Sequence, residues 1–116
     1  VIPVLVVGKS SIFHIALHFA VPALVALLFF PSAWRHSFLV MAATIAVDVD
    51  HLLATPIYDP VRCSIGFHPL HTGLPMLLYV AICFVPKLRL IGLGLVAHMG
   101  LDSLDCYLTS GVWLIQ

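Results

Sequence analysis

Four apolar segments follow one another along the chain, separated by shorter polar stretches. They cover about residues 12–30, 37–54, 71–85 and 88–108. The first, second and fourth come near the ~20 apolar residues that cross a bilayer as a helix, and the third is shorter. Pro31 with Trp34, and Pro86 with Lys87, mark turns typical of a membrane interface. The pattern predicts an all-α polytopic membrane protein, a four-helix transmembrane bundle.

The predicted bundle is one domain, residues 12–108. Residues 1–11 are too short and too mixed to add a span, and we treat them as an N-terminal extension of unknown role; residues 109–116 form a C-terminal tail. Pro22 predicts a kink in the first helix. Gly92, Gly94 and Gly100 would let the fourth helix pack closely against a neighbour.

The composition strengthens the membrane prediction. Of the 116 residues, 62% are hydrophobic and 9% are charged, with a mean hydropathy of +1.15. A soluble domain of this size needs more polar surface. A formal net charge of zero argues against a nucleic-acid partner, which would need a basic stripe. The Trp and Tyr residues are expected to anchor the helices at the interfaces.

The few polar side chains concentrate at four segment ends, which an up-down-up-down bundle brings to one side of the membrane. His14 and His18 are four residues apart, so they share a helix face. His98, Asp102 and Asp105 form a similar stripe on the fourth segment. The complete set is His14, His18, Asp48, Asp50, His51, His68, His71, His98, Asp102 and Asp105.

These residue types indicate a metal site. Imidazole and carboxylate together bind zinc, manganese or iron. An isolated Asp at mid-bilayer costs about 2.5–3.5 kcal/mol on insertion scales, and a neighbouring cation offsets that cost. Ten candidates exceed the four ligands of one tetrahedral site. We therefore expect one or two divalent ions, most readily zinc, with the remaining residues orienting the ligands or moving protons.

Roles follow from position. Asp48 and His51 are three residues apart on one helix face, whereas Asp50 points elsewhere. Asp50 or Asp105 is expected to orient a ligand or to serve as the catalytic general base. The expected metal ligands are His14, His18, Asp48, His51, His68, His71, His98 and Asp102.

Two other interpretations stay open at this point. The pair His14 and His18 equally suits haem or chlorophyll ligation. A non-enzymatic accessory subunit of a larger membrane complex would ligate such a group through His14 or His98. A metal or proton transporter would need polar residues continuing to the opposite face, where the segments are apolar. His36, alone at that far end, is expected to be a packing residue.

The orientation rests on few charges. Arg35, Lys87 and Arg89 lie at the end opposite the polar set, against Lys9 and Arg62 beside it. The positive-inside rule then places the polar set on the non-cytoplasmic face. The three Cys show no CxxC spacing, so no zinc knuckle or redox motif is indicated. Cys63 and Cys106 belong to the polar end, as a disulfide if it is periplasmic and as free thiols if it is cytoplasmic.

Three stretches carry a resemblance to a known family. LHFAVP, VDVDHLLATPIYDPVRCSIGFHPLHT and GLVAHMGLDSLDC resemble small uncharacterised bacterial integral membrane proteins related to the predicted membrane-bound metal-dependent hydrolases. The resemblance covers roughly residues 12–108. That wider group has an Asp-x-Asp-His, a His-x-x-x-x-His-Ser/Thr and a His-x-x-x-Asp element. The corresponding residues here are Asp48, Asp50 and His51, then His68 and His71, then His98 and Asp102.

The middle element departs from that pattern, because FHPLHT separates its histidines by two residues. The resemblance implies an inner-membrane metal-dependent hydrolase. Taken with the metal ligands and the membrane location, it leads us to expect hydrolysis of a lipid-associated ester or phosphoester. The expected partners are the bilayer and a lipid-like substrate, with a homo-oligomer or a larger membrane complex left open.

Overall fold

The computed structural model is all-α, and it describes residues 2–55 and 63–114, with side chains from residue 12 onward except that of Ser110. Asp59 and Arg62 lie outside the described residues, and so does the side chain of Lys9. Within the described ranges the chain forms helices and turns and no strand. The α-helices are α1 (Ile2–Phe29), α2 (Trp34–Ala43), α3 (Gly73–Ile82) and α4 (Arg89–Ser110). Three 3₁₀ segments accompany them: η1 (Pro31–Ala33), η2 (Thr44–Leu53) and η3 (Pro69–His71).

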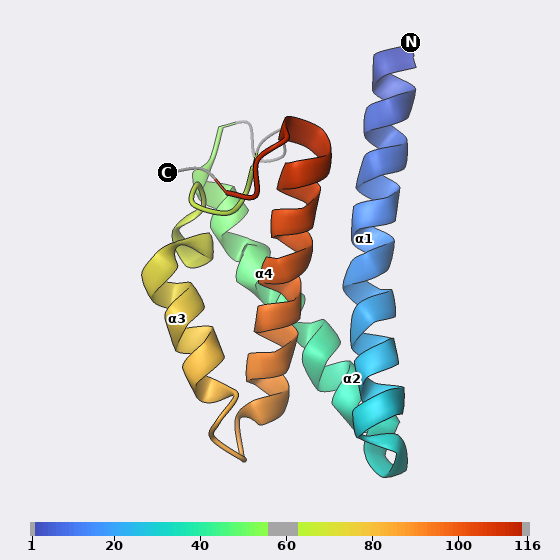
Figure 1. Cartoon of the computed structure of the whole chain (residues 1–116), viewed down its shortest axis with the longest axis vertical. Coiled ribbons are helices and arrows are strands. Elements are labelled where there is room, and N and C mark those ends of the chain that lie inside the picture. Colours follow the sequence, from blue (N-terminus) through green and yellow to red (C-terminus); the bar gives the residue numbers. More distant parts are fainter. Residues whose placement is uncertain (1, 56–62, 115–116) are drawn as a thin grey trace.

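Helix α4 organises the fold, because it packs against α1, α2 and α3 (Figure 1). Two glycines on α4 permit this close packing. A Cβ at Gly94 would lie 2.7 Å from Thr44 Oγ1 and 2.8 Å from the Met41 carbonyl oxygen, and a Cβ at Gly92 would lie 2.8 Å from the Cys83 nitrogen. The prediction for Gly100 is wrong, since a Cβ there would meet nothing within 4 Å.

The first helix is longer than the hydropathy pattern indicated. α1 begins at Ile2, so residues 2–11 continue the helix in which the first apolar segment lies. Pro22 lies inside α1. Because proline has no N–H, it leaves the carbonyl of His18 without its usual helical partner. Gly111 ends α4 with a φ of 76°, a left-handed conformation that glycine adopts without strain.

The second segment changes its winding before the polar residues begin. α2 ends at Ala43, and the chain continues as the 3₁₀ segment η2 through Leu53. At three residues per turn, side chains three apart lie directly above one another. Val47 and Asp50 form the buried face of η2, while Val49 and Leu52 are exposed. The remaining face carries Asp48 and His51, which are half-buried.

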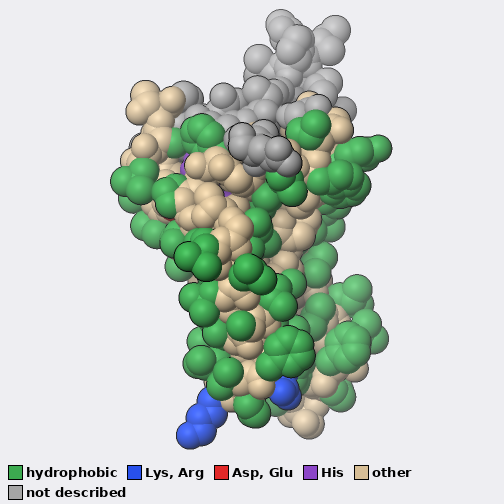
Figure 2. Space-filling model, turned by 60° about the vertical axis from the view of Figure 1, so that its left-hand side comes forward, with side chains coloured by type: hydrophobic (Ala, Val, Ile, Leu, Met, Phe, Trp, Pro, Cys, Tyr) green, Lys and Arg blue, Asp and Glu red, His purple; other side chains and the backbone are tan. Residues whose placement is uncertain are grey.

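Apolar side chains cover the outside of the molecule, and polar ones lie inside. Leu74 is 81% exposed and Phe84 is 78% exposed, and green apolar side chains cover most of the described surface in Figure 2. Two stretches of described helix are long and apolar enough to cross a membrane, Ile12–Phe29 and Pro31–Leu53. The buried polar residues are His18, Ser37, Asp50, His68, His71, His98 and Asp102.

Candidate metal centre

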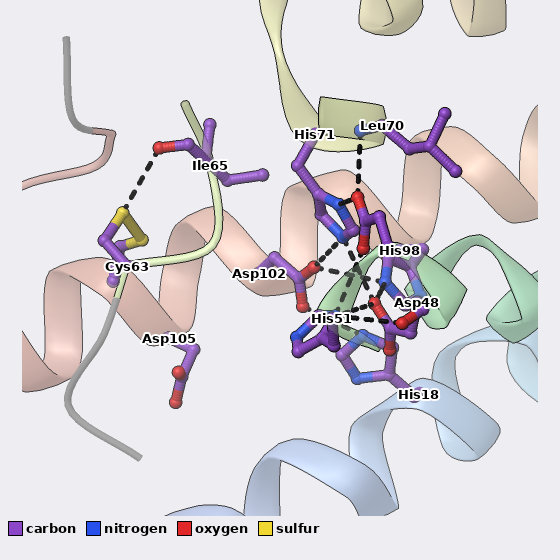
Figure 3. Close-up of polar contacts among 12 residues, drawn as sticks. His18, Asp48, His51, Cys63, Ile65, Leu70, His71, His98, Asp102 and Asp105 are labelled. Atoms are coloured by element: carbon purple, nitrogen blue, oxygen red, sulfur yellow. Dashed lines mark hydrogen bonds and ion pairs between the residues drawn. A yellow bond between two sulfur atoms is a disulfide. The ribbon is translucent and has the colours of Figure 1, made fainter. Parts of the chain in front are cut away.

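The His and Asp side chains meet where α1, η2, η3 and α4 converge (Figure 3). α4 contributes His98 and Asp102, which are one helical turn apart and therefore share a face. The Lys and Arg side chains visible in Figure 2 lie at the opposite end of the molecule. The cluster is thus rich in carboxylate with no described Lys or Arg beside it.

One group of four forms a compact cage. Asp48 Oδ1 and Asp102 Oδ2 each lie between 2.9 and 3.2 Å from the Nε2 atoms of His71 and His98. Ligands about 2.0–2.1 Å from a tetrahedral zinc ion stand about 3.3 Å apart. A cation could therefore sit among these four atoms with little movement. The cage consists of Asp48, His71, His98 and Asp102.

A second group uses the other oxygen of the same aspartate. Asp102 Oδ1 lies 3.0 Å from His14 Nε2 and 3.2 Å from His18 Nε2. Asp102 is 4% exposed, so neither oxygen is solvated by bulk water. These three residues also qualify as a group that could hold a metal ion.

The third group adjoins the cage through Asp50. Asp50 Oδ1 lies 3.2 Å from His51 Nδ1, and the rings of His51 and His68 stack with centroids 3.8 Å apart. His51 Nδ1 also lies 3.0 Å from the Asp48 carbonyl oxygen. The second oxygen of Asp50 serves the cage, because it accepts a hydrogen bond of 2.8 Å from His71 Nδ1.

Two imidazoles have their tautomers fixed by these contacts. A carbonyl or a carboxylate oxygen accepts, so the Nδ1 of His71 must carry the proton it gives to Asp50. Likewise His18 Nδ1 donates to the His14 carbonyl oxygen at 2.8 Å. A neutral ring then presents a bare lone pair at Nε2, the metal-binding atom.

Those two Nε2 atoms face carboxylates without bonding to them. Both are buried, and neither has a hydrogen-bond partner of acceptable geometry among the described residues, although carboxylate oxygens lie within 3.2 Å. A lone pair and a carboxylate oxygen repel each other at such a distance unless a positive charge lies between them. The arrangement therefore calls for a cation or for protonated imidazoles.

The segment that carries His71 is held from both sides. The Leu70 amide donates to Asp50 Oδ2 at 2.8 Å, and the Leu70 carbonyl accepts a hydrogen bond of 2.8 Å from the Tyr79 hydroxyl. Tyr79 is buried, so the expectation that every Tyr anchors at an interface is wrong for this residue. No sequence pattern pointed to it, because its partner is a backbone carbonyl nine residues earlier.

Asp105 lies apart from the three groups. Its Oδ1 is 3.9 Å from His14 Nδ1, and Figure 3 shows the side chain away from the cage. His36 is exposed near the start of α2 and belongs to none of the three groups. The structure thus brings nine of the ten sequence-selected residues into the groups and places Asp105 beside them.

A disulfide ties the loop before η3 to α4. Cys63 and Cys106 are bonded, with a sequence separation of 43 and Cα atoms 4.8 Å apart. Both are buried. The bridge holds the segment leading to His68 and His71 against the helix that carries Asp102.

Two openings adjoin the cluster. A cleft of about 210 Å³ is lined by Asp50, Leu53, Phe67, His68 and neighbouring residues. An apolar groove of about 540 Å³ runs along Val47, Tyr79 and Leu95. Asp48, the residue after Val47, has a side chain 37% exposed and is the most open member of the cage.

The comparisons with known proteins assign the chain to a family of unknown function. The chain belongs to the family of unknown function DUF6122, whose model matches residues 9–109. No curated protein and no solved structure matches the chain. Any chemistry must therefore be argued from the geometry of the cluster.

Proposed function

We propose that this chain is an integral membrane protein whose four-helix bundle holds a divalent metal ion and hydrolyses a lipid-associated ester or phosphoester. The observation that carries the proposal is the cage of Asp48, His71, His98 and Asp102, in which the buried Nε2 of His71 lies 2.9 Å from Asp102 Oδ2 without a hydrogen-bond partner among the described residues. A buried cluster of this composition is difficult to maintain without a cation.

The inverted distribution of side chains supports the membrane part of the proposal. Large apolar residues face outward on each of the four α-helices, and the buried charged residues among those described are Asp50 and Asp102 of the cluster. Aromatic residues lie toward both ends, as in interfacial belts: Trp34 with Arg35 at one end, and Tyr107 stacked on Trp113 at the other. α3 is short for a full span, and it would cross with help from the turns on either side.

The depth of the cluster can be estimated along the helices. At 1.5 Å per residue, His98 and Asp102 lie about 14 and 20 Å from Arg89 at the start of α4. On the same scale, His14 and His18 lie about 22 and 17 Å from Phe29 at the end of α1. Those two helix ends lie at the same end of the bundle (Figure 1). In a hydrocarbon core about 30 Å thick, the site would sit near or just beyond the midplane.

Zinc is the ion that we favour, and manganese or iron also suits mixed nitrogen and oxygen ligands. A bound divalent ion would supply a Lewis acid and lower the pKa of a water molecule. The chain itself holds and orients the ligands: Asp50 fixes the ring of His71 through Nδ1, as carboxylates do behind many zinc-binding histidines.

The hydrolysis can be written in balanced form. The oxygen of water bonds to the carbonyl carbon or the phosphorus, the bond to the leaving oxygen breaks, and one proton of water passes to a base. The leaving oxygen takes up a proton. Asp105, half-buried beside His14 and outside the cage, is the carboxylate that we propose as this base.

The openings fit a lipid-like substrate. Polar groups can reach the cluster through the cleft at Asp50 and His68, while the apolar groove along Val47 and Leu95 could hold an acyl chain. The groove runs along η2, the segment that also carries Asp48 and Asp50. An ester entering sideways from the bilayer would meet the site without crossing the headgroup layer.

We place the site on the non-cytoplasmic side of a bacterial inner membrane. The described basic residues Arg35, Lys87 and Arg89 belong to the connections at the other end, which the positive-inside rule assigns to the cytoplasm. The bridge between Cys63 and Cys106 agrees with this orientation, because disulfides persist in oxidising compartments.

The geometry disfavours the other two interpretations. A haem or chlorophyll ring needs flat space against its imidazole, and the cavity beside His18 and His98 is about 10 Å³, close to the room of one water molecule. A transport path would need a run of polar residues on that side of the cluster, where Ser37 is the single buried polar side chain of the described residues, alongside Ala26 and Met41. Co-purification with partner proteins would test membership in a larger complex.

The test combines metal analysis with an activity screen. Detergent-purified protein should retain at least one equivalent of zinc, manganese or iron, and a double variant Asp48→Ala/His98→Ala should lose it. His36→Ala, which changes an exposed histidine outside the cluster, should retain it. Screening lipid esters and phosphoesters should then reveal a hydrolysis that a chelator stops and the metal restores. Wild-type protein that contains no bound zinc, manganese or iron after purification would contradict the proposal.

A further inference from the structure

We propose that Asp102 bridges two metal ions and that the second ion, held by His14 and His18 of α1, keeps the open coordination position. The inference deepens the proposed function and rests on it, because the first ion is the one in the cage.

The two oxygens of Asp102 serve two different pairs of histidines. Oδ2 lies 2.9 Å from His71 Nε2 and 3.1 Å from His98 Nε2. Oδ1 lies 3.0 Å from His14 Nε2 and 3.2 Å from His18 Nε2. A carboxylate that faces two nitrogen pairs with separate oxygens has the arrangement of a ligand shared between neighbouring ions. Ions in two-metal sites stand about 3.5–4 Å apart, within the span of one carboxylate.

His18 supplies the independent observation for a second ion. Its Nδ1 donates to the His14 carbonyl oxygen at 2.8 Å, and its Nε2 points toward Asp102 Oδ1 at 3.2 Å. That Nε2 is buried and has no hydrogen-bond partner of acceptable geometry among the described residues. A buried nitrogen left in this state is costly unless a cation occupies the position it faces.

The donor counts separate the two positions. The cage provides four protein ligands, the number of a closed structural zinc site, whereas His14, His18 and Asp102 provide three. Three protein ligands leave a fourth position for water or substrate, as catalytic zinc sites do. The first position would hold the fold together, and the second would do the chemistry.

Each position has one member that is partly open. Asp48 of the cage is 37% exposed and His14 of the α1 group is 24% exposed, whereas His18, His71, His98 and Asp102 are each at most 4% exposed. Asp105 lies beside His14, with its Oδ1 3.9 Å from Nδ1. Asp105 therefore stands behind the ring of His14, and the partly open edge of His14 is where water could reach the second ion.

Manganese loading tests the inference with a readout besides activity. After chelation and dialysis against Mn²⁺, wild-type protein should bind two equivalents, and its electron paramagnetic resonance spectrum should show an exchange-coupled pair. His18→Ala should bind one equivalent and give the signal of an isolated ion. His36→Ala serves as the matched control and should behave as wild type.

The outcomes separate this inference from the proposed function. One equivalent in wild-type protein with an isolated-ion signal would overturn the second site and leave the cage standing. No bound manganese, zinc or iron would overturn both. Should His18→Ala fail to fold, His18→Gln and His14→Gln take its place, and the wild-type spectrum alone still decides whether the ions are paired.

Discussion

The two halves of the bundle are held together by opposite kinds of interaction, and α4 takes part in both. In the half near Arg89, Gly92 and Gly94 bring α4 against Cys83 and Met41 with almost no side-chain space between them. In the other half, four of the described elements meet through imidazoles and carboxylates. One half packs closely through glycines, whereas the other gathers carboxylates and imidazoles with no described Lys or Arg beside them.

This difference indicates that the half with the His and Asp side chains is the functional one. Close packing of small residues is a common solution for helices in a membrane. Ionisable groups inside a membrane-spanning bundle are costly and mark functional sites. The variants below are chosen to act on one half and spare the other.

The largest effect is expected from Asp102→Asn. The change removes the carboxylate that contacts all four of the nearest imidazole nitrogens. Loss of a residue that only orients a metal ligand lowers metal affinity by up to about 100-fold. Loss of Asp102, which we propose as a direct ligand, should lower it by more. Isothermal titration of the detergent-solubilised, metal-free protein measures this, and an affinity within a few-fold of wild type would contradict the account.

Opening the disulfide should loosen the metal half without altering its ligands. Replacing both Cys63 and Cys106 by Ser frees a loop with 43 residues of sequence separation, and the free energy of unfolding should fall by about 2–4 kcal/mol. Denaturant titration in detergent measures it. Cys83→Ser is the control, because that thiol is free. Equal stability of all three proteins would show that the bridge contributes nothing.

The packed half can be tested by the same substitution at two positions of one helix. Gly94→Ala places a Cβ 2.8 Å from the Met41 carbonyl oxygen, and the overpacking should cost about 1–3 kcal/mol. Gly100→Ala meets nothing within 4 Å, and should stabilise the helix by about 0.5–1 kcal/mol. Thermal unfolding compares the stabilities of the two variants. If both variants were stabilised, or both destabilised, the result would contradict this packing.

A smaller effect is expected behind the cage. Asp50→Asn keeps the shape of the side chain but removes the charge that orients His71 through Nδ1. Metal affinity should fall by about 10–100-fold, with the stoichiometry unchanged. Competition with a chelator of known affinity measures this. A complete loss of the ion would instead make Asp50 a direct ligand.

The sequence carried the outline of this arrangement but not its connections. The spacing of His98 and Asp102 on α4, and of His14 and His18 on α1, predicted shared helix faces because those segments are regular helices. The metal-ligand roles of all these residues stay predictions. The apolar pattern missed the start of α1 at Ile2, since residues 2–11 alone are too short to indicate a span.

What the sequence could not supply depends on winding and on long-range contacts. An α-helical spacing was assumed for residues 44–53, and the structure has three residues per turn there, which puts Asp50 on the buried face with Val47. The hydroxyl of Tyr79 bonds to the Leu70 carbonyl, a contact that no side-chain pattern encodes. Likewise, Asp102 contacts histidines of both α1 and η3 only because these elements pack on opposite sides of α4 in the fold.

The most direct test of a His and Asp metal centre is X-ray absorption at the zinc edge of the loaded protein. The account predicts nitrogen and oxygen neighbours at about 2.0–2.1 Å and no sulfur shell at about 2.3 Å. Sulfur in the zinc coordination would contradict it, because Cys63 and Cys106 are bonded to each other and Cys83 is no part of the cage.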